Sequence, residues 1–189
     1  MACLLTRSRA EACKDTVAGI KEIYFVDFGL LGVYTVGSSD EITNATSLEN
    51  ITAHKYLVKG NNSFETTVNA SRENGTVFYE QVLNITLKKL TKEDNKELKL
   101  LAAGRPHIFV VDHNDNVFLM GKENGADVTA GTVSTGNALG DFNGYNLTFT
   151  AMEKLPPNFV NVDATSATFP LSELIGLGGT VTIGTPASV

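Results

Sequence analysis

The sequence contains no tryptophan, only two cysteines and only three histidines among its 189 residues. The two cysteines, Cys3 and Cys13, are not accompanied by further ligands at zinc spacing, so we expect no metal site. The histidines, His54, His107 and His113, have no nucleophile or carboxylate partner in an evident catalytic pattern. A phosphate-binding loop, a G-x-S-x-G elbow and an H-E-x-x-H helix are also missing. We therefore expect neither an enzymatic activity nor a cofactor.

Long hydrophobic runs are missing too. No window approaches the roughly 20 apolar residues of a membrane helix, so no membrane partner is expected. The apolar run at the N-terminus is soon interrupted by charges, which is atypical of a signal peptide and favours synthesis in the cytoplasm. A chain of this length is long enough to bury about 70% of its unfolded surface in one domain.

Basic residues are scarce in the C-terminal part of the chain. The net charge of -6 lies wholly beyond Arg105, because the residues up to that point contain equal numbers of acidic and basic side chains. After Arg105 the chain has two basic residues, Lys122 and Lys154, and eight acidic ones: Asp112, Asp115, Glu123, Asp127, Asp141, Glu153, Asp163 and Glu173. An acidic surface repels phosphate, so a protein that grips DNA is disfavoured. Such a surface serves solubility, or forms a wall past which DNA slides without sticking.

Residues 106–150 contain the clearest pattern. Two apolar runs flank the turn formers of residues 113–116 and predict a β-hairpin, and Tyr145–Thr150 predicts a third strand. The turn matches part of a calcium-loop template, but Val117 replaces its required glycine, so no cation is predicted. The glycine-rich segment 121–144 is interpreted as a long loop that contacts another subunit. Its candidate contact residues are Gly125, Asp127, Gly131 and Gly136.

The N-terminal part is predicted to be an arm, residues 1–19, followed by strands at Ile20–Phe28 and Val33–Val36. Residues 37–53 are rich in Ser, Thr, Asn and acidic side chains and are interpreted as a loop. On composition alone, this loop is mobile surface.

A second hairpin is predicted around Asn74-Gly75, a pair typical of a two-residue type I′ turn. That turn would place Arg72 opposite Val77 and Phe64 opposite Ile85. It separates an apolar face, expected in the core, from a polar face that meets water or a partner. The polar face contains Glu65, Thr67, Asn69, Glu80 and Asn84.

One helix is predicted after this hairpin, with Thr91 as N-cap and Asp94 three residues on. A narrow apolar stripe follows at Leu98, Leu101 and Ala102, and Gly104 and Pro106 end the helix. Residues 161–189 are interpreted as a C-terminal extension with one strand at Thr180–Ile183. This strand completes either its own domain or the sheet of a neighbouring copy.

The succession of elements over residues 20–160 resembles the tail tube proteins of tailed bacteriophages. The resemblance is clearest from the apolar hairpin through LMGKENGADVTAGTVSTGNALGDFNGYNLTFTAMEKLPPNFV. It implies a mainly β fold, an antiparallel sandwich or barrel with one flanking helix, long loops and extended termini. It further implies hexameric rings that stack into a hollow tube for DNA ejection, within the virion and in contact with other tail proteins. In that family a long loop near residues 37–53 reaches from one ring to the next, so the resemblance makes Asp40, Glu41, Asn44 and Glu49 candidate contact residues, with a mobile surface loop as the alternative. The polar residues Glu65, Thr67, Asn69, Glu80 and Asn84 then become candidates for the lumen wall.

Two other functions remain open. The first is that of another phage structural protein, such as a neck, terminator or capsid-decorating protein. The second is that of a monomeric carbohydrate- or ligand-binding β-sandwich. The last function requires exposed aromatic residues on one face, and the absence of tryptophan weakens it.

Overall fold

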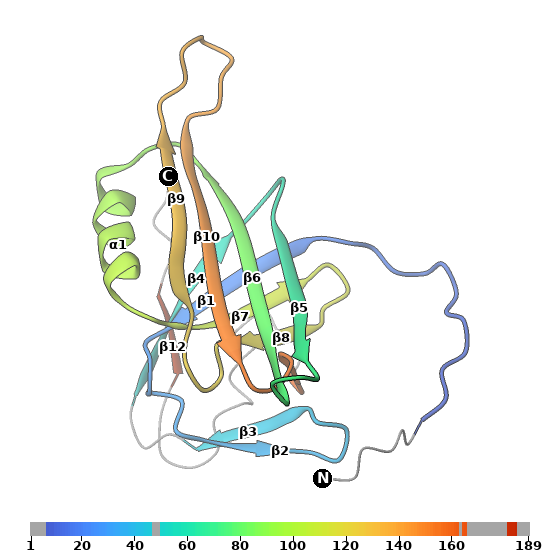
Figure 1. The fold of residues 1–189 in the computed structure, drawn as a ribbon. Helices are drawn as coiled ribbons and strands as arrows, with labels where there is room; N and C mark the ends of the chain where they lie inside the picture. Colours follow the sequence, from blue (N-terminus) through green and yellow to red (C-terminus); the bar gives the residue numbers. More distant parts are fainter. Residues whose placement is uncertain (1–6, 47–49, 163, 166–180, 185–189) are drawn as a thin grey trace.

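The computed structural model describes residues 7–46, 50–162, 164–165 and 181–184. In these residues the protein is a β-sandwich with a single flanking helix, which confirms the predicted fold class (Figure 1). The larger sheet has the strand order β12-β4-β1-β7-β8-β11-β3-β2, and the smaller sheet has the order β5-β6-β10-β9. The elements are β1 (Ile20–Val26), β2 (Val33–Val36), β3 (Ile42–Thr46), β4 (Ile51–Leu57), β5 (Ser63–Ser71), β6 (Thr76–Lys88), α1 (Lys92–Ala103), β7 (His107–Asp112), β8 (Val117–Met120), β9 (Asp127–Ser134), β10 (Gly144–Glu153), β11 (Asn158–Val160) and β12 (Val181–Gly184).

The central strands β1 and β7 are buried on both faces of the larger sheet. Tyr24 and Phe109 belong to an apolar cluster formed by strands of that sheet and by Leu31 of the turn after β1. Ile23 and Ile108, one residue away in each strand, belong to a second cluster between the two sheets. Because successive side chains of a strand point to opposite faces, an unbroken apolar run here fills two cores at once.

The second cluster is completed by the smaller sheet and the helix. Leu83, Leu147 and Phe149 face the larger sheet, and each is at most 2% exposed. Leu98 and Leu101 of α1 pack against the same cluster, as their helical spacing predicts. Ala102 was predicted with them but is exposed.

The ends of the helix agree with the prediction from its capping residues. The hydroxyl of Thr91 accepts a hydrogen bond from the backbone N–H of Asp94, at 3.0 Å. At the other end, the N–H of Gly104 donates to the carbonyl oxygen of Leu100. These bonds satisfy backbone groups that the helix itself leaves without partners.

The hairpin of β7 and β8 is also confirmed, with Val111 opposite Val117. The Asp112 carboxylate accepts backbone N–H bonds from Asn114 and Asn116, both at 2.8 Å. Burial would raise the pKa of this carboxyl, but hydrogen bonds from both asparagines outweigh burial and lower it. The carboxylate is therefore engaged in holding the turn.

Two segments predicted as loops contain strands instead. Residues 121–144 include β9, which pairs with β10, and residues 37–53 include β3 and the start of β4. The strand β9 was missed in the sequence because its glycine and threonine residues interrupt the expected alternation of apolar and polar side chains. Gly131 lies opposite Leu147 in the sheet, and a Cβ there would lie only 3.1 Å from the Leu147 side chain. The strand therefore has glycine where the Leu147 side chain approaches closely, at a position where a sequence pattern expects a larger residue.

The β5–β6 hairpin forms as predicted, but its register is shifted by two residues. Ser71 pairs with Thr76, and Phe64 pairs with Leu83 instead of Ile85. A type I′ turn needs positive φ at both central residues, whereas here Gly75 has φ +62° and Asn74 does not have positive φ. Four residues therefore form the turn. Since a shift of two preserves the alternation, the predicted apolar and polar faces remain on opposite sides of the sheet.

The C-terminal strand β12 pairs in parallel with β4 of its own chain, with Val181 opposite Ile51. Within the single chain, the strand thus joins the sheet of its own domain. The remaining residues of the extension, apart from 161, 162, 164 and 165, lie outside the described residues.

We expect Leu83→Ala to lower the free energy of unfolding by about 2–5 kcal/mol, because it leaves a cavity between the sheets. Val77→Ala is the matched control, since Val77 lies on the same strand and the same side but is 52% exposed. Its effect should stay within about 0.5 kcal/mol. Urea unfolding of both variants measures this difference, and equal losses would contradict the described core.

Candidate functional site: the outer face of the smaller sheet

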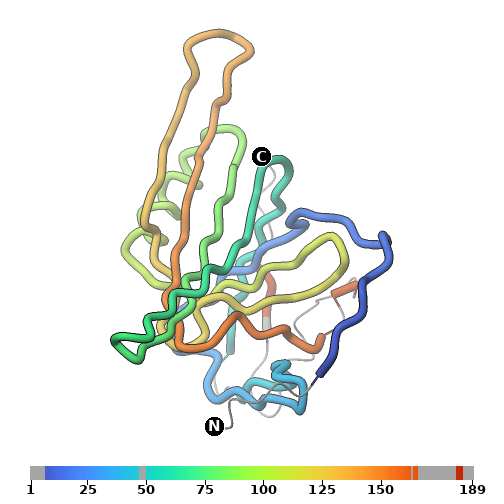
Figure 2. Tube along the Cα trace, turned by 45° about the vertical axis from the view of Figure 1, so that its right-hand side comes forward, coloured from blue at the N-terminus to red at the C-terminus, as the bar shows by residue number. Residues whose placement is uncertain are grey.

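The smaller sheet has one face packed in the core and one face that is not buried. Figures 1 and 2 show its four strands running side by side at one side of the sandwich. We call the second side the outer face. It consists of alternate residues of the four strands, except where a register shift beside Thr148 puts both Thr129 and Ala130 on this side: Ser63, Glu65, Thr67, Asn69 and Ser71 of β5, Thr76, Phe78, Glu80, Val82, Asn84, Thr86 and Lys88 of β6, Asn146, Thr148, Thr150 and Met152 of β10, and Asp127, Thr129, Ala130, Thr132 and Ser134 of β9.

The five candidates for a lumen wall all lie on this outer face. Glu65, Thr67 and Asn69 come from β5, and Glu80 and Asn84 come from β6. Thr67 lies directly opposite Glu80, and the Asn69 amide donates to the Glu80 carboxylate at 3.4 Å. The structure therefore brings these five residues together on one surface.

Many polar side chains of the outer face bind one another across the strands. The Thr148 hydroxyl donates to the Asn84 side-chain oxygen at 2.8 Å, and the Asn84 amide donates to the Ser63 hydroxyl at 3.2 Å. The Thr129 and Thr150 hydroxyls lie 2.8 Å apart. Such cross-strand bonds stabilise the sheet and occupy donors and acceptors that would otherwise bind a ligand.

Another cross-strand bond joins the Thr86 hydroxyl to the Asn146 side-chain oxygen, at 3.0 Å. Sequence reasoning missed the contributions of β9 and β10 to this face. The alternation of polar and apolar residues from Asn146 to Thr150 carried the signal, since every second residue there is polar.

Charge on the outer face is mostly negative. Glu65, Glu80 and Asp127 contribute three carboxylates, and Lys88 at one end of β6 is the basic residue of the face. Of the acidic residues beyond Arg105, Asp127 lies on this surface. The face combines neutral, mutually bonded side chains with a few carboxylates.

Both edges of the smaller sheet are unpaired in the described part of the chain. β5 pairs with β6 alone, and β9 pairs with β10 alone. An edge strand presents backbone N–H and C=O groups that can pair with another chain. The outer face is thus bounded on each side by an edge that can extend the sheet.

Buried polar groups fix the connection between β8 of the larger sheet and β9 of the smaller one. The Gln81 side chain accepts a hydrogen bond from the N–H of Gly121. The Nδ1 of His107 donates to the carbonyl oxygen of Gly121, while its Nε2 accepts from the N–H of Gly29. Burial lowers the pKa of His107, although the bond to Gly121 opposes this shift.

Glu153 holds the same connection from β10. Its Oε1 accepts backbone N–H bonds from Glu123 and Asn124, at 3.0 and 2.9 Å, and the residue is 3% exposed. Burial raises the pKa of this carboxyl, although the two backbone bonds partly oppose the shift. These contacts are structural, because they bring β9 to its place beside β10.

The candidate subunit contacts of residues 121–144 have three different positions. Gly125 is buried, and a Cβ there would lie 2.5 Å from the carbonyl oxygen of Arg105. The prediction that it contacts another subunit through a loop is therefore wrong for Gly125. Asp127 and Gly131 lie in the edge strand β9, and Gly136 lies in the loop beyond it.

The candidates of residues 37–53 are also held within the chain. The carbonyl oxygen of Asp40 accepts a hydrogen bond from Asn158, and the Glu41 carboxylate accepts one from the N–H of Ser39. Asn44 lies in β3, paired with Thr35, and not in a loop. Glu49 lies outside the described residues.

A scan of protein-family models and searches of curated proteins and of solved structures find no match to this chain. In the described part, no helix has the length and apolar character needed to cross a membrane. The same residues contain no group of three or more His, Cys, Asp and Glu side chains that could hold a metal ion. The resemblance to tail tube proteins stays a prediction from the sequence.

We expect Glu153→Gln to stabilise the fold at pH 7 and to have little effect at pH 4. Burial raises the pKa of Glu153, so the folded state binds a proton on this carboxyl more tightly than the unfolded state does. The protonated carboxyl therefore stabilises the fold below the unfolded pKa, and this contribution is lost as the pH rises through the folded pKa. Glutamine keeps an oxygen that can accept both N–H bonds without a buried charge. Urea unfolding at the two pH values tests this expectation.

Glu153→Ala is the control, because it leaves the part-buried N–H groups of Glu123 and Asn124 without their acceptor and should cost about 1–3 kcal/mol. If Glu153→Gln destabilises the protein at pH 7 as much as Glu153→Ala does, the carboxylate charge itself is required and the expectation is wrong.

Proposed function

We propose that this protein is the subunit of a bacteriophage tail tube, in which the outer face of the smaller sheet lines the bore. Copies join into closed rings, expected to contain six subunits, and the rings stack into a conduit for DNA ejection. Its partners are further copies of itself and other tail proteins, and its location is the tail of the virion. DNA passes through without specific binding.

The observation that carries this proposal is the chemistry of the outer face. A conduit wall must not hold the DNA that passes it, so it should offer few free hydrogen-bond donors and few cations. Donors of the outer face, such as the Thr148 hydroxyl and the Asn84 amide, are bonded to neighbouring side chains. Its carboxylates repel phosphate. A sheet that bound DNA would instead present lysine and arginine.

The two unpaired edges support ring formation. If β9 of one copy pairs with β5 of the next, the smaller sheets continue from subunit to subunit and no edge remains when the ring closes. Each neighbouring pair of strands in this sheet is antiparallel, so the two edge strands β5 and β9 run in opposite directions and can form a further antiparallel pair across the subunit boundary. The outer faces then form one continuous wall.

The carbohydrate-binding alternative is less well supported by this face. A glycan platform needs aromatic rings on which sugars can stack. Phe78, at the turn end of β6 and 39% exposed, is the aromatic residue of the outer face. The residues at the centre of the face are threonine, asparagine and valine.

Ring formation is tested by mass measurement and electron microscopy of two proline variants of the edge strand β5. Because backbone N–H groups alternate in direction along a strand, one of Thr67→Pro and Val68→Pro removes an outward N–H and the other removes a bond to β6. We expect the wild type to form rings or tubes. The variant that lacks the outward N–H should keep the thermal stability of the monomer and lose the rings.

Val68→Ala is the matched control and should assemble normally. Two results would contradict the proposal. One is a wild-type mass that stays at the 20.2 kDa of a single chain at every concentration. The other is a set of rings that survives both proline substitutions.

A further inference from the structure

The sequence contains three Asn-Gly pairs, and the structure gives them different surroundings. They are Asn74-Gly75, Asn124-Gly125 and Asn143-Gly144. Asparagine followed by glycine loses its side-chain amide more readily than other asparagines do, because glycine has no side chain to hinder attack by its own backbone nitrogen. The reaction requires that the asparagine side chain can rotate and that the glycine N–H can lose its proton. The three pairs therefore differ in reactivity according to what holds these two groups.

The Asn74-Gly75 pair lies in the exposed turn between β5 and β6. Both residues are exposed, and a Cβ added at Gly75 would meet no atom within 4 Å, so the space around the pair is open. The backbone N–H of Asn74 donates to the Ser71 hydroxyl at 3.2 Å. Among the described residues, no hydrogen bond engages the Asn74 side chain or the Gly75 N–H. Both reacting groups of this pair are therefore free to meet.

The Asn124-Gly125 pair is held by hydrogen bonds at both residues. The Asn124 side-chain amide donates to the carbonyl oxygen of Met152 at 2.8 Å, and its backbone N–H donates to the Glu153 carboxylate at 2.9 Å. The N–H of Gly125 donates to the carbonyl oxygen of Gly121 at 3.1 Å, and Gly125 is buried. The side chain that must rotate and the nitrogen that must attack are thus both occupied.

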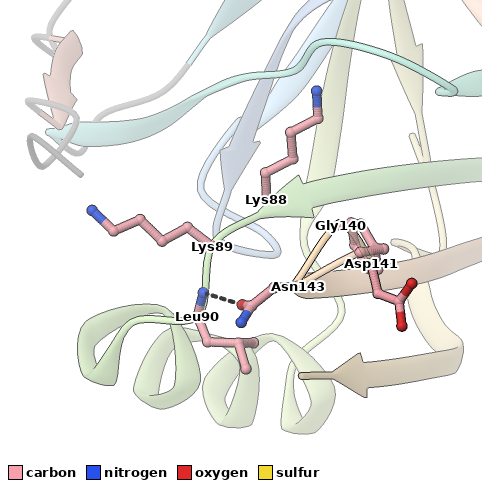
Figure 3. Close-up of a pocket in the computed structure, with 7 residues that line it drawn as sticks. Lys88, Lys89, Leu90, Gly140, Asp141 and Asn143 are labelled. Atoms are coloured by element: carbon pink, nitrogen blue, oxygen red, sulfur yellow. Dashed lines mark hydrogen bonds between the residues drawn. The ribbon is translucent and has the colours of Figure 1, made fainter. Parts of the chain in front are cut away.

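The Asn143-Gly144 pair is held where β10 begins. The Asn143 side-chain oxygen accepts the N–H of Leu90 at 3.2 Å, which ties this side chain to the segment after β6 (Figure 3). Gly144 is buried and lies between two strands of the smaller sheet, opposite Lys88 on one side and Ser134 on the other. Rotation of Asn143 and attack by Gly144 would therefore break contacts that join three strands.

We propose that Asn74 is a site of spontaneous deamidation in the folded protein, whereas the fold protects Asn124 and Asn143. The backbone nitrogen of Gly75 loses its proton to a base and forms a bond to the side-chain carbonyl carbon of Asn74. The bond from that carbon to the amide nitrogen breaks, and the nitrogen leaves as ammonia. Water then opens the resulting succinimide ring at either carbonyl and gives aspartate or isoaspartate. One water is consumed, one ammonia is released, and nothing is oxidised or reduced.

Both products change the turn between β5 and β6. Each adds a carboxylate, so the formal net charge of -6 becomes more negative by one. The turn also contains Arg72 and Glu73, whose charges cancel, so it changes from neutral to negative. Isoaspartate adds one methylene group to the backbone of the turn. Because this insertion lies between the paired residues Ser71 and Thr76, we expect β5 and β6 to keep their register.

The rate of this reaction should rise with pH. Attack requires the deprotonated nitrogen of Gly75, and the deprotonated fraction grows as the pH increases. The reaction needs only this exposed turn and water. It therefore proceeds whether or not the protein forms rings, and its failure would leave the tube proposal untouched.

Mass spectrometry of the folded, full-length protein tests the selectivity. The protein is incubated in heavy-oxygen water at pH 8 and digested, and each peptide that contains an Asn-Gly pair is measured for incorporated oxygen. We expect Asn74 to convert about tenfold or more faster than Asn124 and Asn143, because each protected pair must first break a hydrogen bond. Conversion of Asn74 that is no faster than that of Asn124 or Asn143 would overturn the proposal.

The unfolded chain is the control for intrinsic reactivity. In guanidinium chloride the three pairs lose their different surroundings, so we expect comparable conversion rates at Asn74, Asn124 and Asn143. If Asn124 and Asn143 stay as slow in the unfolded chain as in the folded protein, their neighbours in sequence explain the difference. Protection by the fold would then be wrong.

Asn74→Gln is the matched variant, because glutamine keeps the uncharged amide but would need a larger ring, which forms far more slowly. Under conditions in which ion exchange separates an acidic species from the wild type, we expect this variant to remain a single species. An enzyme that methylates isoaspartate should label the aged wild type and not the variant. An equal amount of acidic, methylated product from Asn74→Gln would contradict the assignment to Asn74.

Discussion

Burial of β1 and β7 on both faces is the constraint on which the rest of this structure depends. Tyr24 and Ile23 are adjacent in sequence, yet each is fully buried in a different cluster. A sheet with two apolar faces needs a cover on both sides. Strands of the larger sheet, together with Leu31 of the turn after β1, form one cluster, and the smaller sheet with α1 covers the other. The smaller sheet is thereby oriented with its apolar side inward and its polar side outward.

This orientation produces the surface to which we assign a function. The outer face is polar, yet pairs such as Thr148 with Asn84 and Thr129 with Thr150 satisfy each other. Polar groups that are already bonded gain little from a passing ligand, and the few carboxylates repel phosphate. Unpaired edges at β5 and β9 give the same sheet a way to continue into a neighbour. A tube subunit requires a face that does not bind DNA and edges that bind neighbouring subunits.

The sequence predicted those parts of the fold that local signals determine. The cap at Thr91, the apolar runs of β7 and β8 and the polar alternation around Asn84 depend on residues close in the chain. The five candidate wall residues could be grouped because a strand's period of two survives an error of two in register. The prediction of one helix and a mainly β fold followed from the same patterns.

The parts that were missed depend on distant contacts. In β9, Gly131 lies where the Leu147 side chain of another strand approaches closely. Gly125 is buried because it packs against the backbone of Arg105. Glu153 holds a connection about thirty residues away, and no local pattern distinguishes it from a surface carboxylate. The Asn74-Gly75 turn was misassigned because the pair is typical of a two-residue turn, whereas four residues form the turn here and keep the same alternation of the two faces.

The most direct test of the central claim is an image reconstruction of the particles that the purified protein forms, at a resolution that separates strands. The account predicts hollow rings or tubes with the outer face of the smaller sheet on the inner wall, and with β9 of each subunit beside β5 of the next. Particles with that face on the outside, or with a neighbouring subunit packed over it, would contradict the account.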